Sequence, residues 1–459
     1  MRNRPSSAVL SRWAGAATLS LLAGVLTALG PVPDRGTAPV RDQTPGTAAH
    51  QPAATRPAGS RPAAPTWVGT WASVPTAVPP GNITVYEKQT IRQVVHASLG
   101  GDSIRVRLTN EFGEQPLVIG RVRVARHAEG APGQEIVAGT DRPVTFSGST
   151  SVTVPAGAPA LSDPVPLSLP AGSDLAVSLY LPERTPVTTV HHYAQQLNVV
   201  ASGDVTREKA LTATSTIDRW CFLSSVDVRT IRREAESVLA FGDSITDGVN
   251  TVQGANHRWP DLLAERFRSR ADTSRLGVIN EAITGNRLLH DPNPPSGSDA
   301  ESYADFFGQS ALRRFDRDIS AQTGIGHVIV LLGINDIGQP GGPAPASEQV
   351  GAQEIVAAHR QLIARAHAQG LKIYGGTLTP FRDDTLGFYS PQREADRQKV
   401  NRWIRTSGEY DAVIDFEAAV RDPRQPDRLL AAYDSGDHLH PNDAGMQAMA
   451  DAVPLSPFR

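Results

Sequence analysis

The feature that most constrains the fold is a regular alternation of short apolar runs and helical patterns from Glu236 to the end of the chain. Five apolar runs have the length of strands buried on both faces: 238–241, 278–280, 328–332, 371–374 and 412–415. Three stretches carry apolar residues at helical spacing: 258–270, 352–368 and 392–407. This alternation predicts an α/β domain over residues 236–459, with a parallel sheet covered by helices on both faces.

Residues 66–235 have a different pattern, in which polar and apolar residues alternate and a helical period is almost absent. Strand signals of this kind recur at 103–109, 122–125, 151–154, 165–169 and 175–181. Glycine, proline, aspartate and asparagine fill the gaps between them, as turns require. The pattern predicts an all-β domain of the sandwich or jelly-roll type before the α/β domain.

The N-terminus has the composition of an export signal. Three arginines, at positions 2, 4 and 12, precede an apolar stretch over residues 13–29, which ends at Gly30-Pro31. The stretch is short and weakly apolar for a membrane anchor, so we expect a signal peptide over residues 1–30 and no stable membrane insertion. Residues 31–65 are rich in proline and alanine and are predicted to form a linker. The protein is therefore expected to be secreted.

Charge and cysteine content exclude several classes of protein. The formal net charge is −3 over 459 residues, which is not the basic balance of a nucleic-acid-binding protein. Cys221 is the single cysteine, so the chain cannot form an intramolecular disulfide and depends on core burial for its stability. Since Cys221 stands between Trp220 and Phe222, we expect a buried, inert thiol.

Polar clusters follow three of the predicted strands, and a fourth lies near the C-terminus. They are 242–246, 280–286, 333–336 and 437–441. Because the carboxyl ends of parallel strands meet at one edge of a sheet, we expect the first three clusters to share a site there.

These clusters contain the residue types that acyl transfer requires. A serine hydroxyl such as that of Ser244 is a poor nucleophile and needs a base, for which His440 is the candidate. Asp437 can orient the imidazole of His440 and stabilise its protonated form. The developing oxyanion needs hydrogen-bond donors, and the candidates are the backbone N–H groups of Ser244 and Gly285 and the side-chain amide of Asn335.

The four clusters resemble the ordered blocks of the SGNH hydrolases, also called the GDSL esterase/lipase family, over residues 236–459. Gly242-Asp243-Ser244-Ile245 is similar to the first block, with isoleucine in place of leucine. Gly285 and Asn335 fall on the second and third blocks, and Asp437 and His440 fall on the last, Asp-x-x-His.

This resemblance implies a three-layer α/β/α fold and hydrolysis of esters through an acyl-enzyme, without a metal or other cofactor. Ala282 departs from the family pattern, in which many members have glycine. The order of an all-β domain followed by this domain is similar to that of secreted bacterial esterases of the acetylxylan type.

Several residues in or near these clusters have alternative interpretations. His438 stands two residues before His440 and is a second candidate for the base. Asp243 is predicted to stabilise its turn, and Asp336 to have a structural role. Metal binding by the adjacent histidines His191-His192 is not supported by acidic residues at ligand spacing.

Four aromatic residues of the β domain could stack on sugars, but a core position is the expectation for each: Trp67, Trp71, Tyr86 and Tyr193.

The predicted substrate is a small-molecule or polysaccharide ester with a short acyl group, such as acetyl. A lipase, phospholipase or thioesterase would use the same catalytic residues. The alternatives from other classes are a carbohydrate-binding protein with an inactive hydrolase domain and a structural protein of the cell wall.

Overall fold

The structure, a computed structural model, describes residues 65–128, 130 and 134–459. The predicted export signal and the linker up to residue 64 lie outside the described residues. All described residues belong to one compact unit, Arg61–Arg459.

The α/β domain is built on a five-stranded sheet in which every pair of neighbouring strands is parallel. In spatial order its strands are β20 (Leu276–Asn280), β19 (Glu236–Gly242), β21 (Ile325–Leu331), β22 (Lys372–Gly376) and β23 (Ala412–Ile414). The chain runs from β19 to β20 on one side and then returns to β21 on the other. This change of direction creates a crevice beside the carboxyl end of β19, where parallel sheets usually bind their ligands. The predicted parallel sheet is confirmed.

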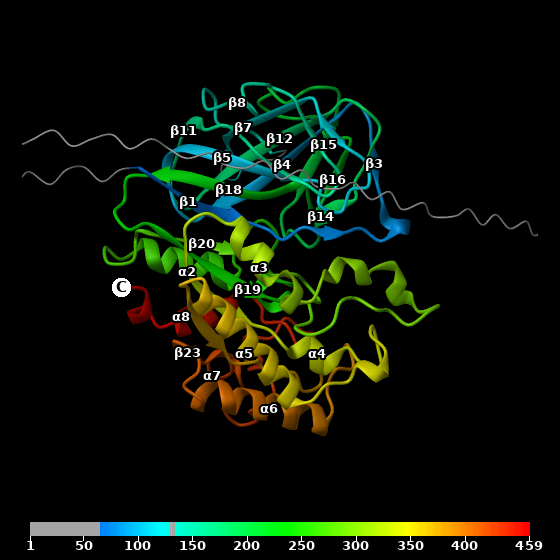
Figure 1. The fold of residues 1–459 in the computed structure, drawn as a ribbon, viewed down its shortest axis with the longest axis vertical. Helices are drawn as coiled ribbons and strands as arrows, with labels where there is room; N and C mark the ends of the chain where they lie inside the picture. The colour runs from blue at the N-terminus through cyan, green and yellow to red at the C-terminus, as the bar shows by residue number, and fades with distance from the viewer. Residues whose placement is uncertain (1–64, 129, 131–133) are drawn as a thin grey trace, which may run out of the picture. The chain divides into compact units, whose positions relative to one another are not determined.

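The helices around this sheet fall into two groups, which are seen with the strands in Figure 1. The first group contains α2 (Trp259–Arg268), α7 (Phe416–Val420) and α8 (Asp443–Ala452). The second contains α3 (Ala311–Ala321), α5 (Ala352–Ala368) and α6 (Pro391–Thr406). The helices α3 and α8 were not predicted from the sequence, because their few apolar residues stand among charged and small ones. Among the described residues, the helices are too short or too polar to span a membrane.

The β domain consists mainly of two antiparallel sheets. The first contains β1 (Thr66–Ala72), β18 (Leu223–Thr230), β5 (Gly101–Thr109), β10 (Pro159–Leu161) and β11 (Val165–Leu169). The second contains β16 (Ser215–Ile217), β15 (Asn198–Ser202), β4 (Gln89–Ala97), β12 (Ser173–Leu181), β7 (Arg121–Arg126) and β8 (Arg142–Val144).

One hydrophobic core contains side chains of both sheets, among them Val106, Val177 and Val226. The prediction of an antiparallel β domain is confirmed, and its classification as a sandwich or jelly roll stays a prediction.

Shorter strands complete the β domain. They are β2 (Thr76–Ala77), β14 (Thr189–His191) and β17 (Trp220–Cys221) in one small sheet, β3 (Val85–Tyr86) with β13 (Thr185–Pro186), and β6 (Leu117–Ile119) with β9 (Val152–Val154). Cys221 is buried, as expected, and burial raises the pKa of its thiol to about 12.

The two domains are joined by hydrogen bonds between β1 and the start of the parallel sheet. The Ser237 hydroxyl donates to the carbonyl of Gly69 at 2.6 Å, and the Gly69 N–H donates to the carbonyl of Thr323 at 2.9 Å. A Cβ atom on Gly277 of β20 would lie 2.7 Å from the Gly69 oxygen, so this close approach requires glycine. The β domain is therefore packed directly on the sheet of the α/β domain.

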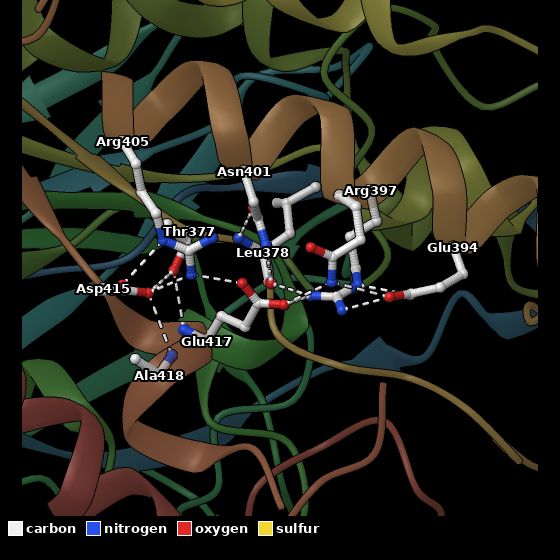
Figure 2. A network of polar contacts seen from close by, with 10 residues as sticks. Thr377, Leu378, Glu394, Arg397, Asn401, Arg405, Asp415, Glu417 and Ala418 are labelled. Carbon is white, nitrogen blue, oxygen red and sulfur yellow. Dashed lines mark hydrogen bonds and ion pairs between the residues drawn. The ribbon is translucent and has the colours of Figure 1, made fainter. Parts of the chain in front are cut away.

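A network of charges, buried at Arg397 and Glu417 and partly exposed at Arg405 and Asp415, fixes α6 to the segments that follow β22 and β23 (Figure 2). Arg397 is fully buried and pairs with Glu417 at 2.8 Å, while it also donates to the carbonyl of Leu378 at 2.7 Å. Arg405, about two helical turns further on, pairs with Asp415 at 2.6 Å. Each buried charge thus has an opposite charge or a carbonyl as partner, which is the condition for tolerating charge in a core.

Candidate active site

Ser244 lies at the sharp turn between β19 and the short helix α1 (Ser244–Asp247). Asp243 forms the N-cap of this helix, and its carboxylate accepts a hydrogen bond from the Ile245 N–H at 3.1 Å. A Cβ atom on Gly242 would lie 2.3 Å from the Thr246 hydroxyl, so the tightness of the turn requires glycine there. The turn places the Ser244 hydroxyl at the carboxyl edge of the sheet.

Ser244, His440 and Asp437 form a continuous chain of hydrogen bonds. The Ser244 Oγ lies 2.8 Å from Nε2 of His440, and Nδ1 of the same ring lies 2.6 Å from Oδ2 of Asp437. Because an ionised carboxylate only accepts hydrogen bonds, Nδ1 carries a hydrogen and the lone pair of a neutral ring remains on Nε2. This arrangement allows His440 to accept a proton from the Ser244 hydroxyl.

The environment of Asp437 keeps its carboxylate ionised. Burial alone would raise its pKa, but the hydrogen bond from His440 and the charge of that ring lower the pKa well below its ordinary value. The backbone N–H groups of Leu439 and His440 also donate to Oδ1, at 3.0 and 2.8 Å. Asn250, which the sequence analysis did not identify, donates to Oδ2 at 2.9 Å.

The candidate oxyanion donors lie on the same cavity as Ser244. Gly285 has a φ of +77°, and a Cβ atom on it would lie 2.1 Å from the ring of Phe307, so both the conformation and the packing require glycine. The Asn335 amide donates to the carbonyl of Asn286 at 3.0 Å, and its side chain also lines the cavity. Gln339, which was not predicted from the sequence, donates a hydrogen bond to the carbonyl of Gly285 at 2.7 Å.

The cavity beside Ser244 has a volume of about 610 Å³ and receives side chains from both domains. Its apolar and aromatic lining residues are Tyr193, Val249, Tyr303, Phe307, Pro343, Leu386, Phe388 and Leu439. His192 and Tyr193 belong to the β domain, in the segment after β14. The expectation of a core position is wrong for Tyr193, which is 38% exposed, because it lies outside the strands, with a φ of +61°.

His438 and Asp336, which were also considered from the sequence, contact other partners. His438 is half-exposed and contacts Asp434, so it does not share the Ser244 hydroxyl with His440. Asp336 accepts hydrogen bonds from the N–H groups of Leu288 and Leu289 at 2.7 and 2.9 Å, which is the structural role predicted for it.

The predicted turn-stabilising role of Asp243 is seen in its N-cap hydrogen bond, but its second oxygen has a different environment. Oδ2 is buried and has no hydrogen-bond partner among the described residues. Burial raises the pKa of Asp243 to about 7. An unpartnered oxygen in such an environment favours the protonated carboxyl.

The neighbouring residues His191 and His192 contact different partners. His191 contacts Asp247, while His192 stacks on Phe306 with ring centroids 4.0 Å apart. Burial lowers the pKa of His192 to about 4, so its ring is neutral near pH 7. No cluster of three or more candidate metal ligands occurs in the described part of the chain.

Of the remaining aromatic residues of the β domain, Trp71 packs edge-on against Trp220 and Tyr86 is buried. Trp67 lies under the guanidinium of Arg105, 4.2 Å from the ring centroid.

The sequence model of the GDSL-like Lipase/Acylhydrolase family matches residues 240–448. This range extends from β19 into α8 and contains Ser244, Gly285, Asn335 and His440. The fold and this match define the class of the α/β domain, which is that of an ester hydrolase. More particularly, this domain belongs to the GDSL-like lipase/acylhydrolase family.

Solved structures similar to this chain include an aryl esterase from M. smegmatis, which is 18% identical in sequence and has a TM-score of 0.35. The match covers 48% of this chain and 96% of the aryl esterase. A carbohydrate acetylesterase from Sinorhizobium meliloti has 16% identity, coverages of 47% and 95%, and a TM-score of 0.34. A GDSL-like lipase from Bacteroides thetaiotaomicron has 17% identity, coverages of 48% and 87%, and a TM-score of 0.32. No curated protein matches the chain.

Proposed function

We propose that the protein is a serine esterase that works through an acyl-enzyme, with Ser244 as nucleophile and His440 as general base. The observation that carries this proposal is the hydrogen-bonded chain from the Ser244 hydroxyl, through His440 at 2.8 Å, to Asp437 at 2.6 Å. The membership of the domain in a family of ester hydrolases gives the reaction class.

In the first half of the reaction, the Ser244 Oγ attacks the ester carbonyl carbon while its proton moves to Nε2 of His440. The carbonyl oxygen becomes an oxyanion, which accepts hydrogen bonds from the N–H groups of Ser244 and Gly285 and from the Asn335 amide. Each such donor is worth about 2.7–4 kcal/mol in the transition state. His440 then gives its proton to the departing alkoxide, and the acyl group remains on Ser244.

In the second half, water takes the place of the alcohol. His440 removes a proton from this water, the resulting hydroxide attacks the acyl carbon, and a second oxyanion forms at the same donors. Collapse of this intermediate breaks the bond to Ser244 Oγ, which recovers its proton from His440. The acid is released and the free enzyme is restored. Asp437 stays ionised throughout and stabilises the imidazolium of each half-reaction.

For the substrate, we propose esters of short acyl groups such as acetyl on a polysaccharide or a similar extracellular molecule. The sequence supports this through the predicted export signal and the companion β domain. An acetyl group fills a small part of a cavity of about 610 Å³, which leaves room for the alcohol component. Export itself is tested by the N-terminal sequence of the protein recovered from culture medium, which should begin after residue 30.

A lipase or phospholipase is the second candidate, because the cavity lining is largely apolar. Leu386 in particular is an exposed apolar side chain, with 57% of its surface accessible, at this cavity. A long acyl chain would gain about 25 cal/mol for every Å² of apolar surface that it buries there. The two candidates share their catalytic residues and differ in the length of the acyl group.

The test is hydrolysis of p-nitrophenyl acetate, butyrate and palmitate by the mature protein and by Ser244→Ala. We expect the wild type to prefer acetate and the variant to be inactive on all three esters. A rate that peaks at palmitate would replace the short-acyl proposal by the lipase. Equal inactivity of both proteins, without covalent labelling of Ser244 by a serine-directed phosphonate, would overturn the esterase proposal in favour of a binding protein.

A further inference from the structure

The contact between the two domains contains a buried histidine–aspartate pair, formed by His191 and Asp247. His191 is the last residue of β14 in the β domain, and Asp247 is the last residue of α1, which begins with Ser244. Nε2 of His191 lies 3.0 Å from Oδ1 of Asp247. Both side chains are only 3% exposed, so water does not compete for this hydrogen bond.

The other ring nitrogen of His191 fixes the orientation of the imidazole. Nδ1 lies 2.9 Å from the carbonyl oxygen of Val74, which follows β1. Since a carbonyl only accepts hydrogen bonds, Nδ1 carries a hydrogen. The ring is therefore held at both nitrogens, by the backbone of its own domain on one side and by Asp247 of the α/β domain on the other.

Asp247 in turn holds the loop that carries the candidate oxyanion donor. Its Oδ2 accepts hydrogen bonds from the backbone N–H of Thr284 at 3.0 Å and from the Thr284 hydroxyl at 2.7 Å. Thr284 directly precedes Gly285, whose N–H is the proposed donor. The position of Asp247 thus determines where this N–H lies relative to Ser244, which is on the same short helix as Asp247.

The far side of the same loop is held from within the α/β domain. Gln339 donates to the carbonyl of Gly285 at 2.7 Å, and Asn335 donates to the carbonyl of Asn286 at 3.0 Å. These two residues belong to α4 (Ile334–Gly338) and its C-terminal end. The loop is consequently fixed between α4 and Asp247, and Asp247 is itself fixed by the β domain through His191.

We propose that His191 is a positioning residue of the esterase, which acts through Asp247 on the Thr284–Gly285 loop. The proposal rests on the proposed function, because it concerns the stabilisation of an oxyanion at Gly285. It gives the β domain a role in the reaction itself: its removal or displacement would leave the nucleophile in place but loosen one of the oxyanion donors. An interaction made mainly in the transition state affects kcat rather than KM.

The test uses two substitutions that each keep one of the two hydrogen bonds of His191. The amide nitrogen of His191→Asn takes the place of Nδ1 and can still donate to Val74. The amide nitrogen of His191→Gln takes the place of Nε2 and can still donate to Asp247. Each variant loses a ring and one buried hydrogen bond, so the two should lose similar amounts of stability. They differ in whether the link to Asp247 survives.

The readout is kcat for p-nitrophenyl acetate, divided by the concentration of sites that react with a serine-directed phosphonate. This correction removes misfolded protein from the comparison. We expect His191→Asn to lose about 10- to 100-fold in kcat, the range for a misplaced catalytic group, with KM within about two-fold of wild type. His191→Gln should be at least about five-fold more active than His191→Asn.

A matched control is provided by His327, a buried histidine at the opposite end of the parallel sheet, whose Nδ1 lies 2.8 Å from the Tyr374 hydroxyl. His327→Asn and His327→Gln should leave kcat per reactive site unchanged. Equal kcat values for His191→Asn and His191→Gln, in an otherwise active enzyme, would overturn the positioning role and leave the esterase intact. An inactive and unlabelled wild type would instead refute the esterase and this role together.

Discussion

Two of the histidine–aspartate pairs in this molecule, His440–Asp437 and His191–Asp247, differ in their third partner, and the comparison shows that this partner decides what such a pair can do. At the carboxyl edge of the sheet, His440 contacts Asp437 with one nitrogen and the Ser244 hydroxyl with the other. At the domain interface, His191 contacts Asp247 with one nitrogen and a backbone carbonyl with the other. A hydroxyl can give up a proton and a carbonyl cannot.

Access to substrate separates the two regions as well. His440 lines the cavity of about 610 Å³, whereas His191 borders a space of only about 20 Å³ between the domains. The first pair is therefore equipped for proton transfer, and the second for holding parts of the molecule in place. Substitutions in and around the two pairs should therefore affect the reaction to different degrees.

The same substitution should lower kcat by very different factors in the two pairs. In Asp437→Asn, the amide donates to Nδ1 of His440, so the neutral ring carries its hydrogen on Nε2 and cannot accept the proton of Ser244. We expect kcat to fall about 10⁴-fold, as for the wrong tautomer in a serine protease triad. In Asp247→Asn, the amide can donate to His191 and its oxygen can still accept from Thr284.

The interface variant Asp247→Asn should accordingly lose about three-fold or less in kcat. His191 is not expected to transfer a proton, so the reaction does not depend on which of its ring nitrogens carries the hydrogen. Both variants are measured as kcat per phosphonate-reactive site. A loss of similar size in the two variants would show that the pairs do not differ in role as described.

Removal of a proposed oxyanion donor should have the next largest effect. Asn335→Ala is expected to lower kcat by about 10²–10³-fold with a small change in KM, because the amide acts mainly in the transition state. Asn198 of the β domain is the control: it is fully buried and donates to the carbonyl of Arg219 at 3.0 Å. Asn198→Ala should destabilise the protein without this loss of kcat, and an equal loss in both would contradict the assignment.

A third aspartate, Asp243, directly precedes Ser244 and should respond to pH differently. Its pKa is about 7 in the folded protein, against about 3.9 in an unfolded chain. Between these values the folded state binds more protons, so the contribution of Asp243 to the free energy of unfolding falls as pH rises, by about 1.4 kcal/mol per pH unit. This contribution is complete below about pH 4 and is lost once pH exceeds about 7.

The measurement is urea denaturation of wild type and Asp243→Asn at pH 5 and pH 7. Asparagine does not ionise, so the stability of the wild type relative to the variant should decrease between the two pH values. Glu281, another buried carboxyl with a raised pKa, is present in both proteins and cancels in this difference. A difference independent of pH would show that Asp243 is already ionised at pH 5.

The smallest effect is expected at the wall that the β domain contributes to the cavity. Tyr193→Ser should lower kcat/KM for p-nitrophenyl butyrate about five-fold more than for methyl acetate, which is too small to reach the ring. That factor corresponds to the loss of roughly 40 Å² of apolar contact at about 25 cal/mol per Å². Leu161→Ser, at an equally exposed apolar residue of β10, is the control. Equal changes for both esters would remove Tyr193 from substrate recognition.

The elements predicted from the sequence were those whose signal is contained in a few consecutive residues. The apolar run 328–332 predicted the strand β21, which is found over Ile325–Leu331, and α5 has apolar residues at helical spacing over its whole length. By contrast, α3 was missed because it buries Arg314 and Asp318, which pair with each other at 2.8 Å. A pattern search counts such residues as exposed, and only a folded core supplies the partners that allow their burial.

The parallel sheet, the β domain and the polar clusters at the strand ends follow from the pattern of residues along the chain. Asp437 and His440 were identifiable because they are three residues apart, so their spacing is a local property. The pairing of His191 with Asp247 was decided by tertiary structure alone. These residues are 56 positions apart and belong to different domains. Periodicity specifies which face of a strand or helix is buried, but the residues that meet across a domain interface depend on how two complete cores pack together.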